Sequence, residues 1–594
     1  MSQFSKAALI AAALFLAVPA GGFAQDVQLS LEPPPNGDNI FDAGFTTTVS
    51  VPSIVAVNSS MNEAALRDVL SGGFMNHVNE VASLTADSIT IPEITVSTTT
   101  TGSEPVTTAF TYRDVVLSKV SNGVAESVSV GSTESGSAEA KFAFGQVSAK
   151  QMDFGGLLAI FGLVEGGDPN QPLKTLYTDY KSEGGTFSSD KVSCTLGPSS
   201  PAEFRARPLA VSFKQFMDAS KQLEDNKDNP PAEAMGMVVK FVGDIFVAFE
   251  ASPTSIDSIA CKGTGDDGKP FDLSVGKISS GGFQGAVFGG ISVDNISIKG
   301  DGDGVVTLGH AEIKPFDFKT TVAGLTDTNL QMSPAYFEQN YRTFVPAWGG
   351  FAFSDLTVDV PSDNPMSKRV KASIASFDLT MSDYINGIPS KLSTSGSGIA
   401  VPLPQDTQDP QVALLLALGL TEVNLGFDIA AGWDQASKTI VVNKVSLEGA
   451  NLAGIALAAS LGNAAEQLFD TNPEIAQTAA LGLTVQGLQI YLRDDGLGNV
   501  LAPLAASPQD KTVGDVRTRL AGLAEGLVLQ IFGATEQARA LGAAVGNFAA
   551  GNATALTLTI TPNDPAGLSV PVLMQAGENP ALLAPMITVT GEAQ

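Results

Sequence analysis

Residues 423–461, VNLGFDIAAGWDQASKTIVVNKVSLEGANLAGIALAASL, decide how the rest of the chain is interpreted. Apolar residues alternate with others before Trp433, and they alternate again after the polar segment that follows it. A period of two is typical of a strand with one buried face, and a polar turn between two such runs predicts a β-hairpin. A hairpin cannot bury its apolar face alone, so further strands or helices have to share the cover.

The same alternation recurs through residues 86–152 and 272–401, where the sequence predicts further strands. Apolar residues three and four apart predict helices between these regions and near the C-terminus. The predicted helices cover residues 60–81 with a break at Gly72-Gly73, 154–164, 209–223, 232–249, 411–420 and a pair within 512–548. We therefore expect a β-rich α+β fold, in which antiparallel sheets of degenerate hairpin repeats pack with helices and a helical hairpin lies near the C-terminus.

The chain is long enough for several domains. The expected regions are a signal peptide at 1–24, an N-terminal α+β domain at 25–270, a β-rich hairpin-repeat region at 271–462, and a helical region with closing strands at 463–594. Lys6, the apolar run 7–18 and the small residues before Gln25 are typical of a cleaved secretory signal. We expect a periplasmic or secreted protein with no transmembrane span in the mature chain.

Charge and cysteine content restrict the partners and the compartment. A formal net charge of −29 repels nucleic acid, so a nucleic-acid partner is not expected. Cys194 and Cys261 are the only cysteines, and two cysteines in an exported protein predict one disulfide. Closing the loop between these two cysteines stabilises the fold by about 4 kcal/mol in the chain-entropy estimate.

A short pattern recurs at four places. Two apolar residues are separated by one position, and after two further positions an apolar residue, then Asp or Asn, then another apolar residue follow. The four Asx residues are Asp153, Asp317, Asp378 and Asn451, and each follows an alternating run. Asx side chains bond to nearby backbone, so we expect each of them to end a strand or cap a helix. Chance matches within any antiparallel sheet are the alternative explanation.

Hairpin units of this kind, behind a signal peptide and before an Ala/Leu-rich helical tail, resemble uncharacterised exported proteins of Gram-negative bacteria. More distantly they resemble the AsmA-type and YdgA-type envelope proteins. The resemblance covers residues 110–460 in strand pattern only. It implies an envelope location and transfers no site residue.

Motifs for common catalytic chemistry are missing from the sequence. The two histidines, His77 and His310, lie outside any H-E-x-x-H setting, and there is neither a G-x-S-x-G elbow nor a phosphate-binding loop. We expect no enzyme activity, no cofactor and no metal. Catalysis by an unfamiliar site is kept as a further hypothesis beside the two given below.

One local concentration of aromatic residues provides candidate ligand contacts, namely Tyr336, Tyr341, Arg342 and Trp348. Flat rings stack on carbohydrate or apolar ligands, but they also pack between domains, and packing is the commoner role. Many one-sided strands together with apolar helices favour a protein that binds a lipid or another hydrophobic ligand along a sheet face. The alternative is a structural scaffold that binds an envelope protein partner.

Overall fold

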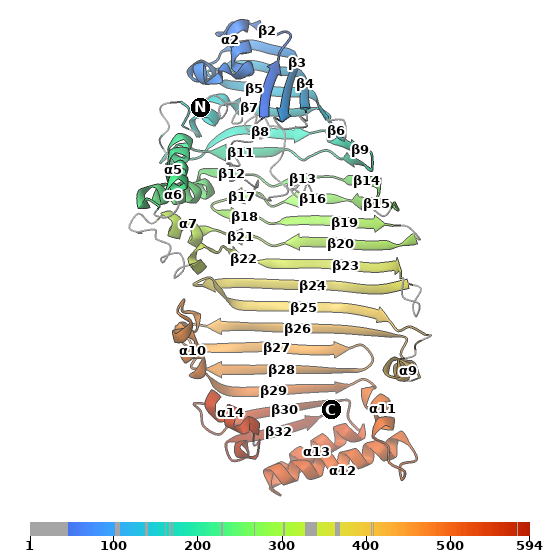
Figure 1. The fold of residues 1–594 in the computed structure, drawn as a ribbon. Coiled ribbons are helices and arrows are strands. Elements are labelled where there is room, and N and C mark those ends of the chain that lie inside the picture. Colours follow the sequence, from blue (N-terminus) through green and yellow to red (C-terminus); the bar gives the residue numbers. More distant parts are fainter. Residues whose placement is uncertain are drawn as a thin grey trace. The chain divides into compact units, whose positions relative to one another are not determined.

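The computed structural model describes residues 45–594 apart from residues 101–106, 137–139, 161, 165–167, 169, 227–229, 266–267, 301–302, 327–340, 363–368, 406, 408, 418 and 579. The chain divides into two compact units. Unit 1 comprises Met1–Asp301 and Pro315–Glu338, and unit 2 comprises Gly302–Lys314 and Gln339–Gln594. The β-rich α+β fold is confirmed, because each unit is built on antiparallel strands with associated helices (Figure 1). The region boundaries at 270 and 462 stay a prediction, and the signal peptide lies outside the described residues.

Unit 1 begins with a sheet in the order β1/β2–β3–β4–β5, which then continues along two branches. The strands of the sheet are β1 (Phe45–Ser50), β2 (Val55–Val57), β3 (Ala86–Thr100), β4 (Thr107–Ser121) and β5 (Val124–Gly136). One branch runs through β7 (Val147–Asp153), β8 (Lys174–Ser182), β11 (Ala202–Ala206), β12 (Phe249–Ala251), β17 (Phe283–Gln284), β18 (Val287–Phe288) and β21 (Phe316–Asp317). The other runs through β6 (Ala140–Phe144), β9 (Gly185–Ser189), β10 (Val192–Leu196), β14 (Ile259–Thr264), β15 (Pro270–Val275), β19 (Ile291–Lys299), β16 (Lys277–Ser280) and β13 (Thr254–Ile256).

The helices of unit 1 bury two apolar clusters. They are α2 (Glu63–Asp68), η2 (Val69–Gly73), η3 (Phe74–Asn76), α3 (Val78–Ala82), α4 (Phe154–Ile160), α5 (Phe213–Asp225), α6 (Ala232–Ala248) and α7 (Lys319–Thr326). Leu66 of α2 packs with Ile89 and Met152 of the sheet in the first cluster. Phe241 of α6 packs with Leu176 and Leu209 in the second. These contacts explain why such apolar helices occur in unit 1.

The first predicted helix is interrupted where expected but capped by a different residue. Gly72 has φ 114°, a conformation that glycine adopts readily, and it separates α2 from the turns that follow. Ser60 and Glu63 have the spacing of a capping box, which predicts Ser60 as the N-cap. Instead, the Asn62 side chain accepts a hydrogen bond from the Ala65 N–H at 2.9 Å. For α6, the sequence predicts Asn229 as the cap because it precedes Pro230-Pro231. Asn229 lies outside the described residues, and Pro231 occupies the N-cap position.

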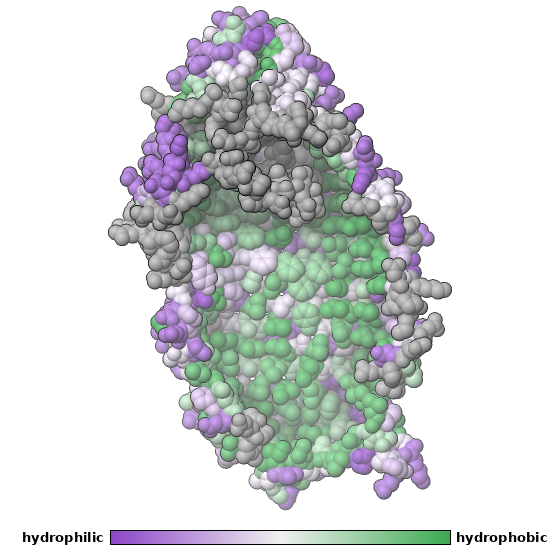
Figure 2. Space-filling view, viewed as in Figure 1, coloured by the Kyte–Doolittle hydropathy of each residue, from purple (hydrophilic) through white to green (hydrophobic). Residues whose placement is uncertain are grey.

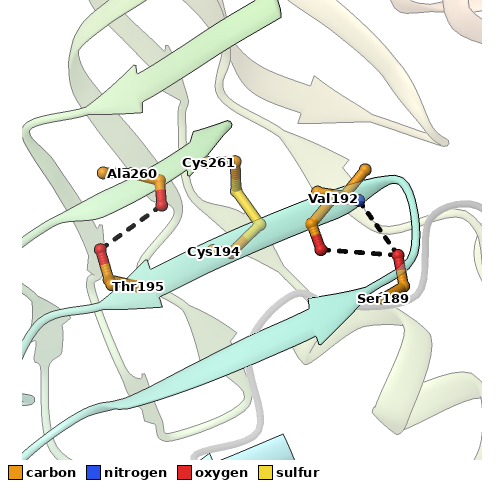
Figure 3. Close-up of a disulfide and its surroundings, with 6 residues drawn as sticks. All are labelled: Ser189, Val192, Cys194, Thr195, Ala260 and Cys261. Atoms are coloured by element: carbon orange, nitrogen blue, oxygen red, sulfur yellow. Dashed lines mark hydrogen bonds between the residues drawn. A yellow bond between two sulfur atoms is a disulfide. The ribbon is translucent and has the colours of Figure 1, made fainter. Parts of the chain in front are cut away.

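The predicted cysteine pair joins two neighbouring strands of unit 1 (Figure 3). Cys194 of β10 is directly opposite Cys261 of β14, with 4.0 Å between the Cα atoms and 2.15 Å between the sulfur atoms. Paired residues of antiparallel strands share a face, so the disulfide needs no distortion of the sheet register.

Removing the disulfide is expected to destabilise unit 1 by about 4 kcal/mol, because the reduced chain regains the entropy of the open loop. The test is hydrogen exchange of β10 and β14 in a Cys194→Ala, Cys261→Ala variant, where amide protection should fall. Trp348 and Trp433, the chain's two tryptophans, lie in unit 2, so their unfolding midpoint by fluorescence provides the control and should not move. Unchanged protection in β10 and β14 would contradict the stabilising role.

Unit 2 contains one meandering antiparallel sheet, which Figure 1 shows as a ladder from β23 to β29. The strands pair in the order β20 (Val305–Ile313), β23 (Gly350–Pro361), β24 (Arg369–Ile385), β25 (Ile388–Pro402), β26 (Glu422–Asp434), β27 (Thr439–Gly449), β28 (Ala453–Gly462), β29 (Thr484–Asp494), β30 (Ala555–Pro562) and β32 (Ile587–Ala593). Two short strands, β22 (Ala347–Trp348) and β31 (Leu568–Ser569), accompany them. The hairpin predicted from residues 423–461 is confirmed as β26 and β27, and β28 adds a third strand.

The Asx pattern holds at three of its four places. Asp153 accepts a hydrogen bond from the Gly156 N–H at the start of α4, and Asp317 accepts one from the Lys319 N–H at the start of α7. Asn451 lies in the turn between β27 and β28 with φ 58°. The prediction is wrong at Asp378, which lies in the middle of β24. The repeat as a whole stays a prediction.

The helices of unit 2 lie mainly near the C-terminus. They are η5 (Tyr341–Phe344), α9 (Pro410–Ala417), η6 (Glu466–Phe469), α10 (Pro473–Leu481), α11 (Leu497–Leu501), η7 (Ala502–Ala505), α12 (Val513–Phe532), α13 (Glu536–Ala550), α14 (Val570–Glu578) and η8 (Pro580–Leu583). The predicted helical hairpin is confirmed as α12 and α13. Apolar residues three and four apart, among them Val516, Leu523 and Leu527, predict one buried side of α12. That side is only partly covered, since Val516 is buried while Leu523 and Leu527 are 62% and 56% exposed.

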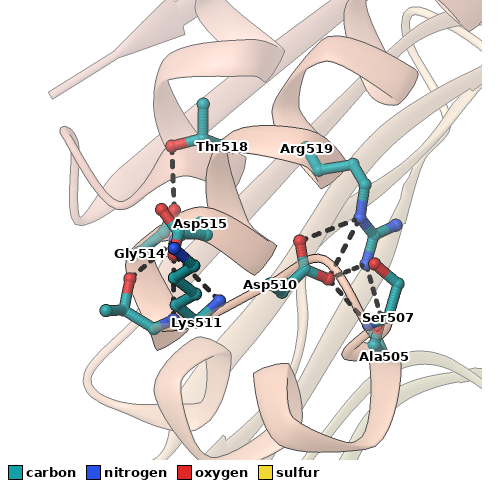
Figure 4. A network of polar contacts seen from close by, with 9 residues as sticks. Ala505, Ser507, Asp510, Lys511, Gly514, Asp515, Thr518 and Arg519 are labelled. Atoms are coloured by element: carbon teal, nitrogen blue, oxygen red, sulfur yellow. Dashed lines mark hydrogen bonds and ion pairs between the residues drawn. The ribbon is translucent and has the colours of Figure 1, made fainter.

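Polar contacts hold the first turn of α12 in place (Figure 4). Thr512 and Asp515 form a capping box, in which each side chain accepts a hydrogen bond from the other residue's backbone N–H. Asp510 accepts hydrogen bonds from the Arg519 guanidinium at 2.9 Å and from the Ser507 N–H at 2.7 Å. These two donors lower the pKa of Asp510 to about 2.

This lowered pKa predicts an acid-sensitive contribution to the stability of unit 2. A carboxyl group whose folded pKa lies below its ordinary value of 3.8 stabilises the fold above that pH, and the contribution is lost as the pH falls through about 2. The melting temperature of an Asp510→Asn variant, followed by tryptophan fluorescence, should therefore lie below that of the wild type at pH 6. The difference should close between about pH 4 and pH 2, and a difference that stays constant over this range would contradict the assignment.

Candidate ligand-binding face

Strand register places three rows of mostly apolar residues on one side of the unit 2 sheet. Residues directly opposite each other in antiparallel strands share a face, so chains of paired residues trace rows across the sheet. The first row is Ala311, Phe353, Phe377, Gly396, Phe427, Leu447, Ile455, Leu492, Leu556 and Ala593. The second is Ile313, Phe351, Leu379, Thr394, Ile429, Val445, Leu457, Ile490, Leu558 and Gly591. The third is Met381, Leu392, Ala431, Val442, Ala459, Leu488, Ile560 and Val589. We call the surface formed by these three rows the apolar face.

A further row lies between the first row and the second row. Its side chains point to the opposite side of the sheet, and most of them are polar. It consists of Glu312, Ala352, Asp378, Ser395, Asp428, Ser446, Ala456, Tyr491, Thr557 and Glu592. We call this side the polar face. A sheet with one apolar and one polar side normally buries the apolar side against another layer.

Over the middle strands, the apolar face is open to solvent. Leu447 of β27 is 53% exposed, Ile455 of β28 is 47% exposed and Val445 of β27 is 39% exposed. Figure 2 shows a continuous hydrophobic surface over β23–β29, with hydrophilic residues at its margins. Single exposed apolar residues are common on protein surfaces, whereas a contiguous patch of this kind makes the apolar face the candidate site.

At the C-terminal end of the sheet, a helix covers the apolar face. A Cβ atom at Gly591 of β32 would lie 2.8 Å from Leu541 Cδ1 and 3.4 Å from Ala544 Cβ, so α13 lies directly on this strand. Leu556 of the neighbouring β30 is only 2% exposed. The open part of the apolar face therefore ends where α13 begins to cover it.

Aromatic rings are concentrated on β23 to β26 of the apolar face. Phe377 stacks on Phe351 and Phe353 with centroid distances of 5.0 and 5.4 Å, and it meets Phe427 edge-on at 6.2 Å. The Phe427 ring lies over Gly396 of β25, where an added Cβ would approach Cε1 to 2.5 Å. Glycine at this position lets the ring lie flat across the neighbouring strand.

The predicted aromatic contacts are distributed over different environments. The Trp348 ring stacks on Phe351 at 6.1 Å, which places it beside the apolar face. Tyr341 and Arg342 lie on η5, where the Arg342 guanidinium is 5.7 Å from the Tyr341 ring and donates a hydrogen bond to the Asp470 carbonyl. Tyr336 lies outside the described residues, and ligand contact by these residues stays a prediction.

The polar face carries ion pairs between neighbouring strands. Lys314 Nζ lies 2.6 Å from Asp378 Oδ2, and Lys444 Nζ lies 3.4 Å from Asp428 Oδ2. Partial burial of Asp378 opposes its ionisation, but hydrogen bonds from Lys314 and Thr380 lower its pKa. These charges satisfy one another on their own side of the sheet and leave the apolar face without them.

Other polar residues of the described chain form ion pairs within unit 1. His77 contacts Asp68 across the kink at Gly72 and also contacts Glu80, three residues further along the chain. Arg205 pairs with Glu250, and Arg207 pairs with the buried Asp244 of α6. Among the described residues there is no group of three or more His, Cys, Asp or Glu side chains that could hold a metal ion. The helices that the structure describes include none of the length and apolar character needed to cross a bilayer.

The alternation of Phe353–Val358 and Val423–Ile429 was the sequence signal for the apolar face. It identified one-sided strands but could not show which of them are neighbours, so no residue of the three rows was predicted as a site residue, and Trp348 lies beside the face. Trp348 was named because it belongs to a local aromatic concentration.

Comparison with known proteins adds one match. Residues 446–594, from β27 to the C-terminus, match a family model described as an uncharacterized protein. No curated protein matches the chain, and no solved structure matches it. The matched segment contains the last strands of the apolar face together with the helical hairpin that covers its end.

Proposed function

We propose that this protein is an exported, non-enzymatic protein of the bacterial envelope that binds a lipid or another hydrophobic ligand on the apolar face of unit 2. The supporting observation is the three rows of apolar side chains, which stay open to solvent at Leu447 and Ile455. Export is proposed from the apolar N-terminal run and is supported by the disulfide. A place among AsmA-type and YdgA-type envelope proteins is proposed on the strand pattern and the one-sided sheet.

The polarity of the face favours an apolar ligand over a folded protein partner. Protein interfaces contain about one hydrogen bond for every 100–200 Å². The interior strands pair their backbone groups with neighbouring strands, and Thr394 is the one polar side chain within the three rows. Alkyl chains require no hydrogen bonds, and burying them on this surface removes apolar area from water on both sides.

The test is native mass spectrometry and solvent extraction of the mature protein purified from its own bacterium without detergent. The expected result is a mass increment that disappears on extraction and corresponds to a recovered lipid. A bare apo mass, together with failure of the folded protein to take up added lipid, would contradict a lipid-binding role.

An interaction scaffold is the second candidate, and α12 provides an observation in its favour. Leu523 and Leu527 are exposed one helical turn apart, and added Cβ atoms at Gly522 and Gly526 beside them would meet nothing within 4 Å. A scaffold should retain a protein partner without lipid and lose it in a Leu523→Gln, Leu527→Gln variant. Retention of lipid alone would contradict this alternative.

A further inference from the structure

Building on the proposed function, we infer that the apolar face binds amphiphiles with long alkyl chains and distinguishes them by chain length rather than by head group. Three features of the molecule support it: the composition of the rows, the length of the open stretch and the position of α13.

The composition of the rows leaves little with which to recognise a head group. Binding sites for specific small molecules place a few polar groups among apolar walls to fix the ligand's orientation. Thr394 is the only polar side chain among the paired positions of the apolar face. The charges of Asp378, Lys444 and Asp428 belong to the polar face. A polar head group therefore gains little by lying on the rows and stays in water.

The open stretch is longer than a membrane lipid chain. Seven strands, β23 to β29, lie between β20 and the strands covered by α13, and neighbouring strands are about 4.8 Å apart. The open stretch is thus about 29 Å long across the strands. The hydrocarbon core of a bilayer is about 30 Å thick and contains two leaflets, so one chain spans about 15 Å. A whole chain fits before it meets Leu541 and Ala544 of α13.

Such a site should gain affinity with every methylene up to membrane-lipid length. Full burial of a methylene tightens binding about fourfold. An open face covers about half of a chain's surface, which reduces the gain to about twofold for each methylene. Binding should therefore tighten about 16-fold between chains of 12 and 16 carbons.

The experiment uses alkylphosphocholines and alkyl maltosides with 8 to 16 carbons, kept below their micelle concentrations, and measures displacement of N-phenylnaphthylamine from the full mature chain. Phosphocholine is zwitterionic and maltose is uncharged, so the negative charge of the protein affects neither series strongly. The expected result is an affinity gain of about 16-fold between 12 and 16 carbons in both series. Amphiphiles of equal chain length should differ less than about threefold in affinity between the two head groups. A Thr394→Val variant should leave this head-group ratio unchanged.

A plateau beyond 10 carbons, or a difference of more than tenfold between head groups, would overturn the inference while leaving the proposed function intact. If neither the dye nor any amphiphile binds to the folded protein, the proposed function itself fails.

Discussion

An aspartate in place of Val445 should weaken binding of hexadecylphosphocholine at least tenfold. Val445 lies in the second row of the apolar face between Ile429 and Leu457. A carboxylate there would lose hydration when an alkyl chain covers it, and it would find no hydrogen-bond donor among the neighbouring side chains of the row. The measurement is displacement of N-phenylnaphthylamine from the variant and from the wild type.

Val441 of the same strand provides the matched control. Val441 and Val445 are each 39% exposed, but Val441 is opposite Gly432 and Ser460 on the polar face. Val441→Asp makes the same chemical change at the same exposure and should leave binding within about twofold of the wild type, since no apolar ligand covers it. Equal losses in the two variants, with circular dichroism showing both folded, would contradict the location of the site.

Replacing Arg517 by methionine should destabilise the hairpin of α12 and α13 by about 3 kcal/mol or more. Arg517 is buried, and its guanidinium donates to Asp494 at 2.8 Å and to Asn499 at 3.0 Å. It also donates to the carbonyls of Phe548 and Ala549 at the end of α13. Removing it leaves the Asp494 carboxylate and those carbonyls without this donor, and breaking one side of a buried ion pair costs about 3–5 kcal/mol.

Hydrogen exchange of residues 513–550 measures this effect, because a protein of two compact units need not unfold in one step. Arg519→Met is the control on the same helix. Arg519 pairs with Asp510 but remains 37% exposed, and a pair of that kind contributes about 1 kcal/mol or less. If Arg517→Met changed protection no more than Arg519→Met, the hairpin would not depend on the buried contacts. If the hairpin did open, more of the apolar face at Leu556 and Gly591 should become available to a ligand.

The fold class could be predicted from the sequence because period-two alternation depends on the chain's own pleat and on no distant residue. The hairpin at 423–461 was predicted correctly for this reason. The helical hairpin at 512–548 was predicted from apolar residues three and four apart, a pattern that is equally local. Which strands are neighbours could not be predicted, so the ring contacts of Phe377 with Phe351 and Phe427 across strands came from the structure alone.

Strict alternation also assigns residues to the wrong side wherever a strand contains a bulge. In β27, Val442 and Lys444 pair with two consecutive residues of β26. Asn443 between them is therefore an extra residue. By sequence parity, Val441 and Val445 belong to one face, whereas the bulge places them on opposite faces.

Two further errors have local physical causes. The apolar spacing of α12 predicts that Leu523 and Leu527 share one side of the helix, but spacing cannot show whether a neighbour covers that side. Asp378 was interpreted as a strand end because Asx residues usually satisfy their side chains with nearby backbone. In the structure, Lys314 and Thr380 satisfy it from the polar face, so β24 continues to Ile385.

The most direct test of the central claim uses photo-cross-linking amino acids at four positions of β27. Val445 and Leu447 belong to the apolar face, whereas Lys444 just before them and Glu448 just after them lie on the polar face. After incubation with hexadecylphosphocholine and irradiation, adducts are expected at 445 and 447 and not at 444 and 448. Adducts of equal yield at all four positions, or no adduct at any position of a correctly folded protein, would contradict ligand binding on the apolar face.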